Sequence, residues 1–74
     1  MPKDAQYVVA LDDGSLTVAP LDGDAPVIWT LVPADAEALQ SGSLNLNVAF
    51  MQGRAKAAGD GRALLELLKR TQAL

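Results

Sequence analysis

The β-forming residues near the start of the chain fall into two segments. Residues 6–11 are rich in β-forming side chains, residues 15–19 resume a two-residue period with Leu16 and Val18 on one side, and Asp12-Asp13-Gly14 separates the two segments. Two such segments around an Asp-Gly pair are typical of antiparallel strands joined by a tight turn, in which the glycine has a positive φ. The pattern predicts a β-hairpin, and the two aspartates are interpreted as turn residues and not as metal ligands.

A third strand is predicted at residues 27–31, after a loop at residues 20–26 that contains two prolines, two aspartates and a glycine. The two-residue period of a strand places Val27, Trp29 and Leu31 on the same face. Because aliphatic side chains flank the indole there, Trp29 is predicted to pack in the core. That role is compatible with forming one wall of an apolar pocket.

A short helix is predicted at residues 34–40. Pro33 suits the first helical turn, and Asp35 and Glu37 place negative charge at the positive end of the helix dipole. The helix is expected to end at Gly42, because glycine readily adopts the left-handed conformation that follows many helices.

A second helical segment is predicted at residues 46–51. Asn45 precedes it as a typical N-cap, and Gly53 lies just past its end. Phe50 and Met51 are consecutive, so their side chains cannot both point inward. One of them is expected to line a groove or to contact a partner, and methionine suits an adaptable apolar surface.

The last part of the chain changes from a strand period to a helical period. Arg54 and Lys56 alternate with alanines, which predicts a short strand at residues 54–58. Gly59 then breaks this pattern, and Asp60 is the predicted N-cap of a helix. The apolar residues of that helix recur at helical spacing at Ala63, Leu64, Leu67 and Leu68, with Leu65 at the margin. This helix must be covered by other apolar surface.

The composition limits how the helix can be covered. The chain has 74 residues, half of them hydrophobic, and contains neither cysteine nor histidine. A domain of this size buries only about 60% of the surface that its unfolded chain exposes, and no disulfide or thiolate metal site can stabilise it here. A second subunit or a bound apolar ligand is therefore expected to cover the helix. The same composition excludes the usual zinc sites, thiol catalysis and histidine acid-base chemistry.

The formal net charge of −3 argues against a nucleic-acid partner and against electrostatic attachment to an anionic membrane, although most basic residues follow residue 53. The sequence contains no signal peptide and no run of about 18 apolar residues. It therefore predicts a soluble cytoplasmic protein without integral membrane association.

The order of these segments resembles the sterol carrier protein 2 family, the sterol-binding domain of lipid-transfer proteins. The resemblance extends from about Tyr7 to Leu68. It rests on the helix that ends in Gly42, on Leu44-Asn45, on the segment Ala49-Phe50-Met51-Gln52-Gly53-Arg54-Ala55-Lys56, and on Gly59-Asp60 before the leucine-rich helix.

The resemblance implies an α+β fold, with a mostly antiparallel sheet of about four strands and with short helices and the C-terminal apolar helix on one face. It also implies a non-catalytic domain that binds or carries a lipid, a fatty acyl group or a sterol-like molecule in an apolar tunnel, without a cofactor or a metal. The residues that would line this tunnel are Trp29, Leu31, Leu39, Phe50, Met51, Leu64, Leu67 and Leu68.

The chain departs from the family at its N-terminus. Family members usually begin with an amphipathic helix and a first strand that lies in the middle of the sheet, and this sequence starts after both. Residues 1–74 are therefore expected to form a single domain that lacks these elements. Bare strand edges and apolar faces favour association. A homodimer is expected, in which two copies complete each other's sheet or cover each other's helices.

Two other functions stay open. The same apolar residues could fill a solid core without a cavity, in a dimeric interaction module or in an accessory to an enzyme that acts on apolar substrates. The chain could also be a cofactor-free enzyme, similar to a cyclase, that shapes an apolar substrate in a closed pocket. The groups that such an enzyme could use are Tyr7, Asp60, Arg62 and Glu66.

Overall fold

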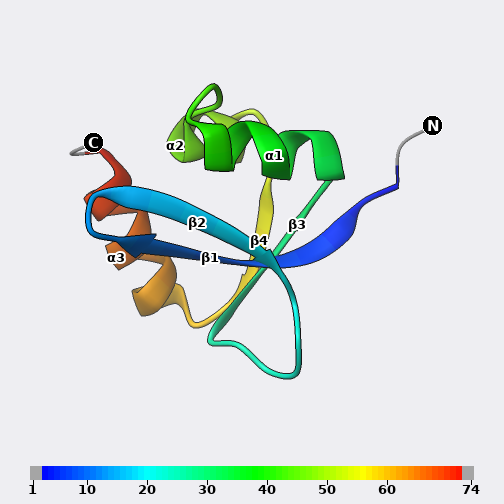
Figure 1. Cartoon of the computed structure of the whole chain (residues 1–74). Helices are drawn as coiled ribbons and strands as arrows, with labels where there is room; N and C mark the ends of the chain where they lie inside the picture. Colours follow the sequence, from blue (N-terminus) through cyan, green and yellow to red (C-terminus); the bar gives the residue numbers. More distant parts are fainter. Residues whose placement is uncertain (1–2, 73–74) are drawn as a thin grey trace.

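The computed structural model describes residues 3–72, which form an α+β fold (Figure 1). Its elements are β1 (Ala5–Asp12), β2 (Ser15–Pro20), β3 (Val27–Leu31), α1 (Pro33–Ser41), α2 (Leu46–Met51), β4 (Lys56–Gly59) and α3 (Gly61–Gln72). The strands make one sheet in the order β2-β1-β3-β4, and each neighbouring pair is antiparallel. The fold class predicted from the sequence is confirmed.

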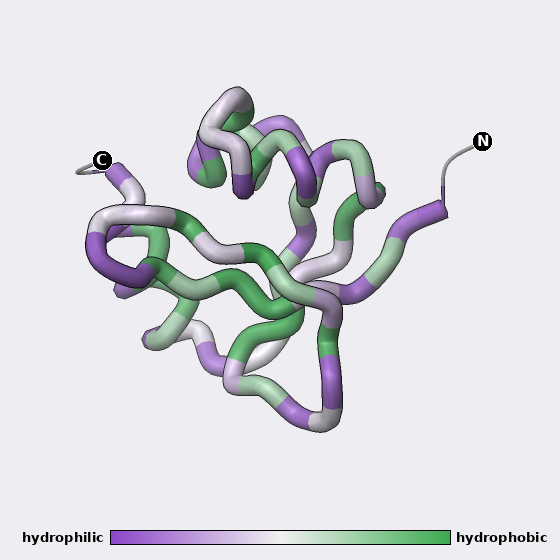
Figure 2. The backbone as a smooth tube through the Cα atoms, viewed as in Figure 1, coloured by the Kyte–Doolittle hydropathy of each residue, from purple (hydrophilic) through white to green (hydrophobic). Residues whose placement is uncertain are grey.

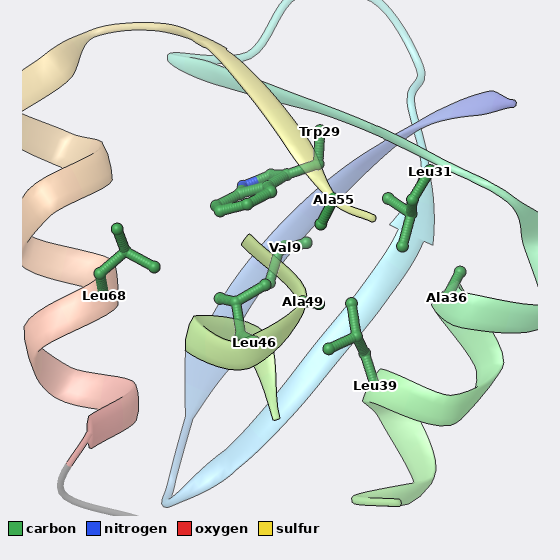
Figure 3. Packing of buried hydrophobic residues seen from close by; sticks show 9 residues of the cluster. All are labelled: Val9, Trp29, Leu31, Ala36, Leu39, Leu46, Ala49, Ala55 and Leu68. Atoms are coloured by element: carbon green, nitrogen blue, oxygen red, sulfur yellow. The ribbon is translucent and has the colours of Figure 1, made fainter. Parts of the chain in front are cut away.

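The core lies on the face of the sheet that α1, α2 and α3 cover. Its buried side chains come from β1, β3, the helices and the residue before β4 (Figure 3): Val9, Trp29, Leu31, Ala36, Leu39, Leu46, Ala49, Ala55 and Leu68. Hydrophobic residues are concentrated along the strands in the middle of the molecule, whereas the hairpin turn and the tip of the loop between β2 and β3 are hydrophilic (Figure 2). Trp29 and Leu31 are both 0% exposed, as the alternation along β3 predicts.

The hairpin turn fixes how β1 and β2 pair. Asp13 and Gly14 have φ angles of 55° and 80°, the geometry of a two-residue type I′ turn. The sequence predicts a positive φ at Gly14, and the structure extends it to Asp13, a residue type that tolerates this conformation. Asp12 and Ser15 flank the turn as partners, and in such a turn the flanking pair exchanges backbone hydrogen bonds.

The alternation of the ladder then determines which backbone groups of β1 face away from β2. Counted back from Asp12, the N–H and C=O groups of Leu11, Val9 and Tyr7 point to the other side, toward β3. Pro20, which has no N–H, lies opposite Tyr7 at one of these positions. The proline therefore fits into β2 without loss of a ladder hydrogen bond.

β1 and β3 pair over only a short length. Their register joins residues 5–7 to residues 29–31, and among the described residues it does not continue past Tyr7 opposite Trp29. The outward backbone groups of Val9 and Leu11 lie beyond the end of this ladder. They have no strand partner on that side within residues 3–72.

β4 begins later than the sequence predicts. The expected strand covers residues 54–58, whereas β4 is Lys56–Gly59. The amides of Arg54 and Ala55 both donate to the carbonyl oxygen of Ala49, at 2.9 and 3.1 Å, so this part of the chain closes the end of α2. Ala55 is buried nevertheless, on the side that the predicted alternation assigns to it.

Both predicted side-chain N-caps are present. Asn45 Oδ1 accepts hydrogen bonds from the amides of Asn47 and Val48, at 2.9 and 3.3 Å, at the start of α2. Asp60 Oδ1 accepts a hydrogen bond from the amide of Arg62, at 2.9 Å, at the start of α3. These bonds satisfy amides that the first turn of a helix leaves without a partner.

An ion pair connects α1 to the segment after α2. Arg54 Nη2 lies 2.6 Å from Asp35 Oδ1. The hydrogen bond from Arg54 and the charge of Asp35 raise the pKa of Arg54 above its usual value. A raised pKa of a base stabilises the folded state at pH values below the pKa of the unfolded chain. This contribution is therefore lost as the pH rises through the raised pKa of Arg54, in strongly alkaline solution.

A buried polar contact holds α2 against the end of α3. Asn47 Nδ2 donates to Thr71 Oγ1 at 2.8 Å and to the carbonyl oxygen of Leu68 at 3.3 Å. Thr71 Oγ1 in turn donates to the same carbonyl oxygen at 2.9 Å. Thr71 is only 2% exposed, so its hydroxyl needs these partners. The contact fixes the last turns of α3 over the core.

Candidate functional site

A groove opens beneath α3, at the place where β1 and β3 separate. Its volume is about 240 Å³. The lining is mostly apolar and consists of Val8, Val9, Leu11, Pro26, Val27, Ala63, Glu66, Leu67 and Arg70. We refer to it as the α3 groove.

The gap between β1 and β3 forms the floor of the α3 groove. Val8 and Val9 are consecutive in β1, so their side chains point to opposite faces of the strand. Both nevertheless line the groove, together with Val27 at the start of β3. The groove therefore follows the part of the sheet where these strands do not pair.

Glu66 and Arg70 supply the charged groups that line the α3 groove. They are four residues apart on α3, a spacing that places two side chains on the same face of a helix. Both residues are exposed, whereas Ala63 and Leu67 on the same side of the helix are half-buried. The groove thus combines an apolar interior with a charged rim, which suits an apolar molecule that has a polar end.

Grooves beside α1 are larger and more polar. Glu37, Gln40 and Ser41 contribute to a groove of about 560 Å³ between α1 and the hairpin strands. Ser15, Gln40 and Asn45 contribute to another of about 410 Å³ near the hairpin turn. Small-molecule sites are lined mainly by apolar side chains. We therefore take the α3 groove as the candidate site, because its lining is more apolar than that of the two larger grooves.

Half of the residues predicted to line a tunnel lie in the packed core. Trp29 and Leu31 are 0% exposed, Leu39 is 1% exposed and Leu68 is 9% exposed. Figure 3 shows their side chains pointing into the space between the sheet and the helices. Leu39 also reaches the groove near the hairpin turn. A tunnel lined by the whole predicted set stays a prediction.

The other predicted tunnel residues are partly or largely exposed. Leu64 and Leu67 are half-buried on α3, and Leu67 lines the α3 groove. The Phe50 ring packs edge-on against Trp29, with the ring centroids 6.0 Å apart, and is 36% exposed. Met51 is 78% exposed. Of the two consecutive residues, Phe50 therefore turns toward the core and Met51 turns outward.

Most of the residues that form the α3 groove lie outside the predicted tunnel set. Besides Leu67, the groove is lined by the apolar residues Val9, Leu11, Val27 and Ala63. The sequence pattern could have grouped some of these residues. Val9 and Leu11 share one face of a strand, and Ala63 precedes Leu67 by one helical turn. No local sequence pattern predicts that β1 packs against α3, the contact that brings these two groups of residues together.

The groups considered for an enzyme are dispersed over the fold. Asp60 caps α3 and accepts a hydrogen bond from the amide of Arg62. Tyr7 lines the groove beside α1, whereas Glu66 lines the α3 groove. Within residues 3–72 no three acidic side chains are placed to hold a metal ion. These positions do not bring the candidate groups into one shared pocket.

The fold and the groove define a small α+β domain that carries its helices on one face of an antiparallel sheet and has an apolar groove beneath its last helix. The chain belongs to the SCP-2 sterol transfer family, whose model matches residues 1–70. This match confirms the resemblance found in the sequence, and lipid binding and transfer is the activity of that family. No curated protein and no solved structure matches the chain. Among the described helices, none is long and apolar enough to cross a membrane.

Proposed function

We propose that this protein binds and carries an apolar small molecule, such as a lipid, a fatty acyl group or a sterol-like compound, without catalysis. The observation that carries the proposal is an apolar groove in a chain of the SCP-2 sterol transfer family. The α3 groove, at about 240 Å³, lies just below the volume of typical ligand pockets, about 300–1,000 Å³. It fits a narrow chain or one end of a larger ligand.

The core beside the α3 groove supports the proposal that a longer ligand extends inward. Leu67 lines the groove, and its neighbour Leu68 belongs to the core. Val27 lines the groove from the face of β3 that also carries Trp29. A ligand that entered here and displaced α3 from the sheet would meet these core residues. Such a path would include Trp29, Leu67 and Leu68 of the predicted tunnel residues.

Filling the groove tests the proposal. Ala63→Phe places an aromatic ring in the α3 groove, where Ala63 is half-buried. We expect it to weaken the binding of a fluorescent fatty acid at least about tenfold, because the ring occupies much of a small site. Emission from Trp29, the single tryptophan, gives a second readout.

The matched control is Leu65→Phe, which adds a ring to the same helix at a side chain that is 61% exposed and lies outside the groove. It should bind the probe as the wild type does. Wild-type affinity in the folded Ala63→Phe variant would place the ligand elsewhere, and absence of saturable binding by the wild type would contradict the proposed function.

A second candidate is an interaction module in which two copies complete each other's sheet. The observation that favours it is the early end of the β1–β3 ladder, which leaves the backbone groups of Val9 and Leu11 without a strand partner among residues 3–72. β4 is a suitable strand to enter this gap in a second copy. It lies at the edge of the sheet, and its Ala57 and Ala58 have small side chains.

Light scattering after size exclusion tests this second candidate. If a strand of another copy fills the gap, the wild type forms a dimer at micromolar concentration. Leu11→Pro removes an N–H that faces the gap and leaves the β1–β2 hydrogen bonds in place, so it should give a monomer. Leu65→Ala should stay dimeric. A monomeric wild type would contradict the dimer, and a dimer unaffected by Leu11→Pro would exclude this interface.

A further inference from the structure

The indole nitrogen of Trp29 is a buried donor without an acceptor. Trp29 is 0% exposed, and its Nε1 is the one buried side-chain nitrogen or oxygen without a hydrogen-bond partner within residues 3–72. A buried polar group left unpaired lowers stability, and a domain of this size has little stability to lose. Phenylalanine would fill an apolar core without that cost. The N–H of Trp29 is therefore a candidate hydrogen-bond donor to a ligand.

The indole is held firmly in place. Tyr7 and Ala57 are its neighbours on the adjoining strands, and the Phe50 ring packs against it at an interplanar angle of 73°. In Figure 3 the ring extends from β3 toward α3, where Leu68 faces it. A donor fixed by neighbours on several sides is suited to select a ligand, because the ligand must bring its acceptor to one position.

The α3 groove borders the core cluster that contains the indole. Val27 lines the groove and lies two residues before Trp29 on the same face of β3, a separation of roughly 7 Å along a strand. Val9, which also lines the groove, belongs to the same core cluster as Trp29. A ligand end that passes between these two valines approaches the indole ring.

We propose that the ligand of this protein carries an uncharged hydrogen-bond acceptor, such as a hydroxyl, ketone or ester oxygen, at the end that enters first, and that Trp29 Nε1 donates to it. This inference rests on the proposed function and adds a chemical class of ligand to it. A carboxylate does not fit at this position, because a charge moved into an apolar core needs a partner of opposite charge. The cation of the groove, Arg70, is exposed on α3.

Two probes of similar shape, decanol and decene, separate the hydrogen bond from apolar contact. We expect decanol to bind about five- to tenfold more tightly than decene, the effect of one added hydrogen bond. The chain has a single tryptophan, so the indole N–H gives one NMR signal. Decanol should move this signal in the direction of a stronger hydrogen bond, and decene should not.

Trp29→Phe removes the donor and keeps an aromatic ring. In this variant decanol should no longer bind more tightly than decene, because its hydroxyl has lost the donor. The NMR shift in the wild type provides the same test if the variant does not fold. Equal binding of both probes by the wild type, with an unchanged indole signal, would overturn the hydrogen bond and leave the proposed function in place. If neither probe binds, both the proposed hydrogen bond and the proposed function are overturned.

Discussion

Replacing Gly59 by alanine is expected to cause the largest loss of stability in this chain. A Cβ atom at this position would collide with the carbonyl oxygen of Pro26, which also accepts a hydrogen bond from the amide of Asp60 at 2.8 Å. Gly59 has a φ of 126°, which side chains disfavour. We expect the free energy of unfolding to fall by at least about 3 kcal/mol, a large part of the stability of a small domain.

Gly23→Ala is the matched control for this prediction. Gly23 also has a positive φ, 79°, but a Cβ atom there would have no heavy atom within 4 Å. Its replacement should cost only about 1–2 kcal/mol, the strain of the left-handed conformation. Urea unfolding followed by Trp29 fluorescence measures both variants. Equal losses would show that the approach of β4 to Pro26 does not limit the stability of the fold.

Leu31→Ala is expected to have the second large effect, and it bears on the predicted tunnel. Leu31 is 0% exposed in the core between the sheet and the helices. Removing a leucine side chain from packed surroundings lowers the free energy of unfolding by about 2–5 kcal/mol, because apolar contacts are lost and a cavity remains. Urea unfolding measures this loss directly.

The control is Leu65→Ala, at a leucine that is 61% exposed, which should change the free energy of unfolding by no more than about 0.5 kcal/mol. A similarly small loss for Leu31→Ala would contradict the packed core. That result would indicate that Leu31 borders an open cavity, as the predicted tunnel requires.

The parts of the fold that the sequence predicts are those decided within a few residues. Asn45 and Asp60 cap their helices as expected. Gly42 ends α1 with a φ of 88°, and its amide donates to the carbonyl oxygen of Leu39 at 3.3 Å. Each of these outcomes depends on residues two or three positions apart, so local side-chain chemistry is sufficient to predict it.

The candidate site depends on contacts between distant parts of the chain. Nothing near Tyr7 signals that β1 separates from β3 after it, because the register of strands far apart in sequence is set by tertiary packing. The two hydrogen bonds to the carbonyl oxygen of Ala49, which delay the start of β4, involve residues five and six positions further on. The α3 groove results from such contacts, so the tunnel set implied by the family resemblance includes Leu67 but neither Val9 nor Ala63.

The outer edge of β2 has a consequence for the protein at high concentration. The amide of Val18 points away from the sheet and donates to Gln40 Oε1 of α1 at 3.2 Å. Pro20, two residues further along the same edge, has no amide hydrogen to offer. A strand of another molecule could not form hydrogen bonds with the backbone N–H at either position. Growth into fibrils by pairing at the outer edge of β2 is therefore disfavoured.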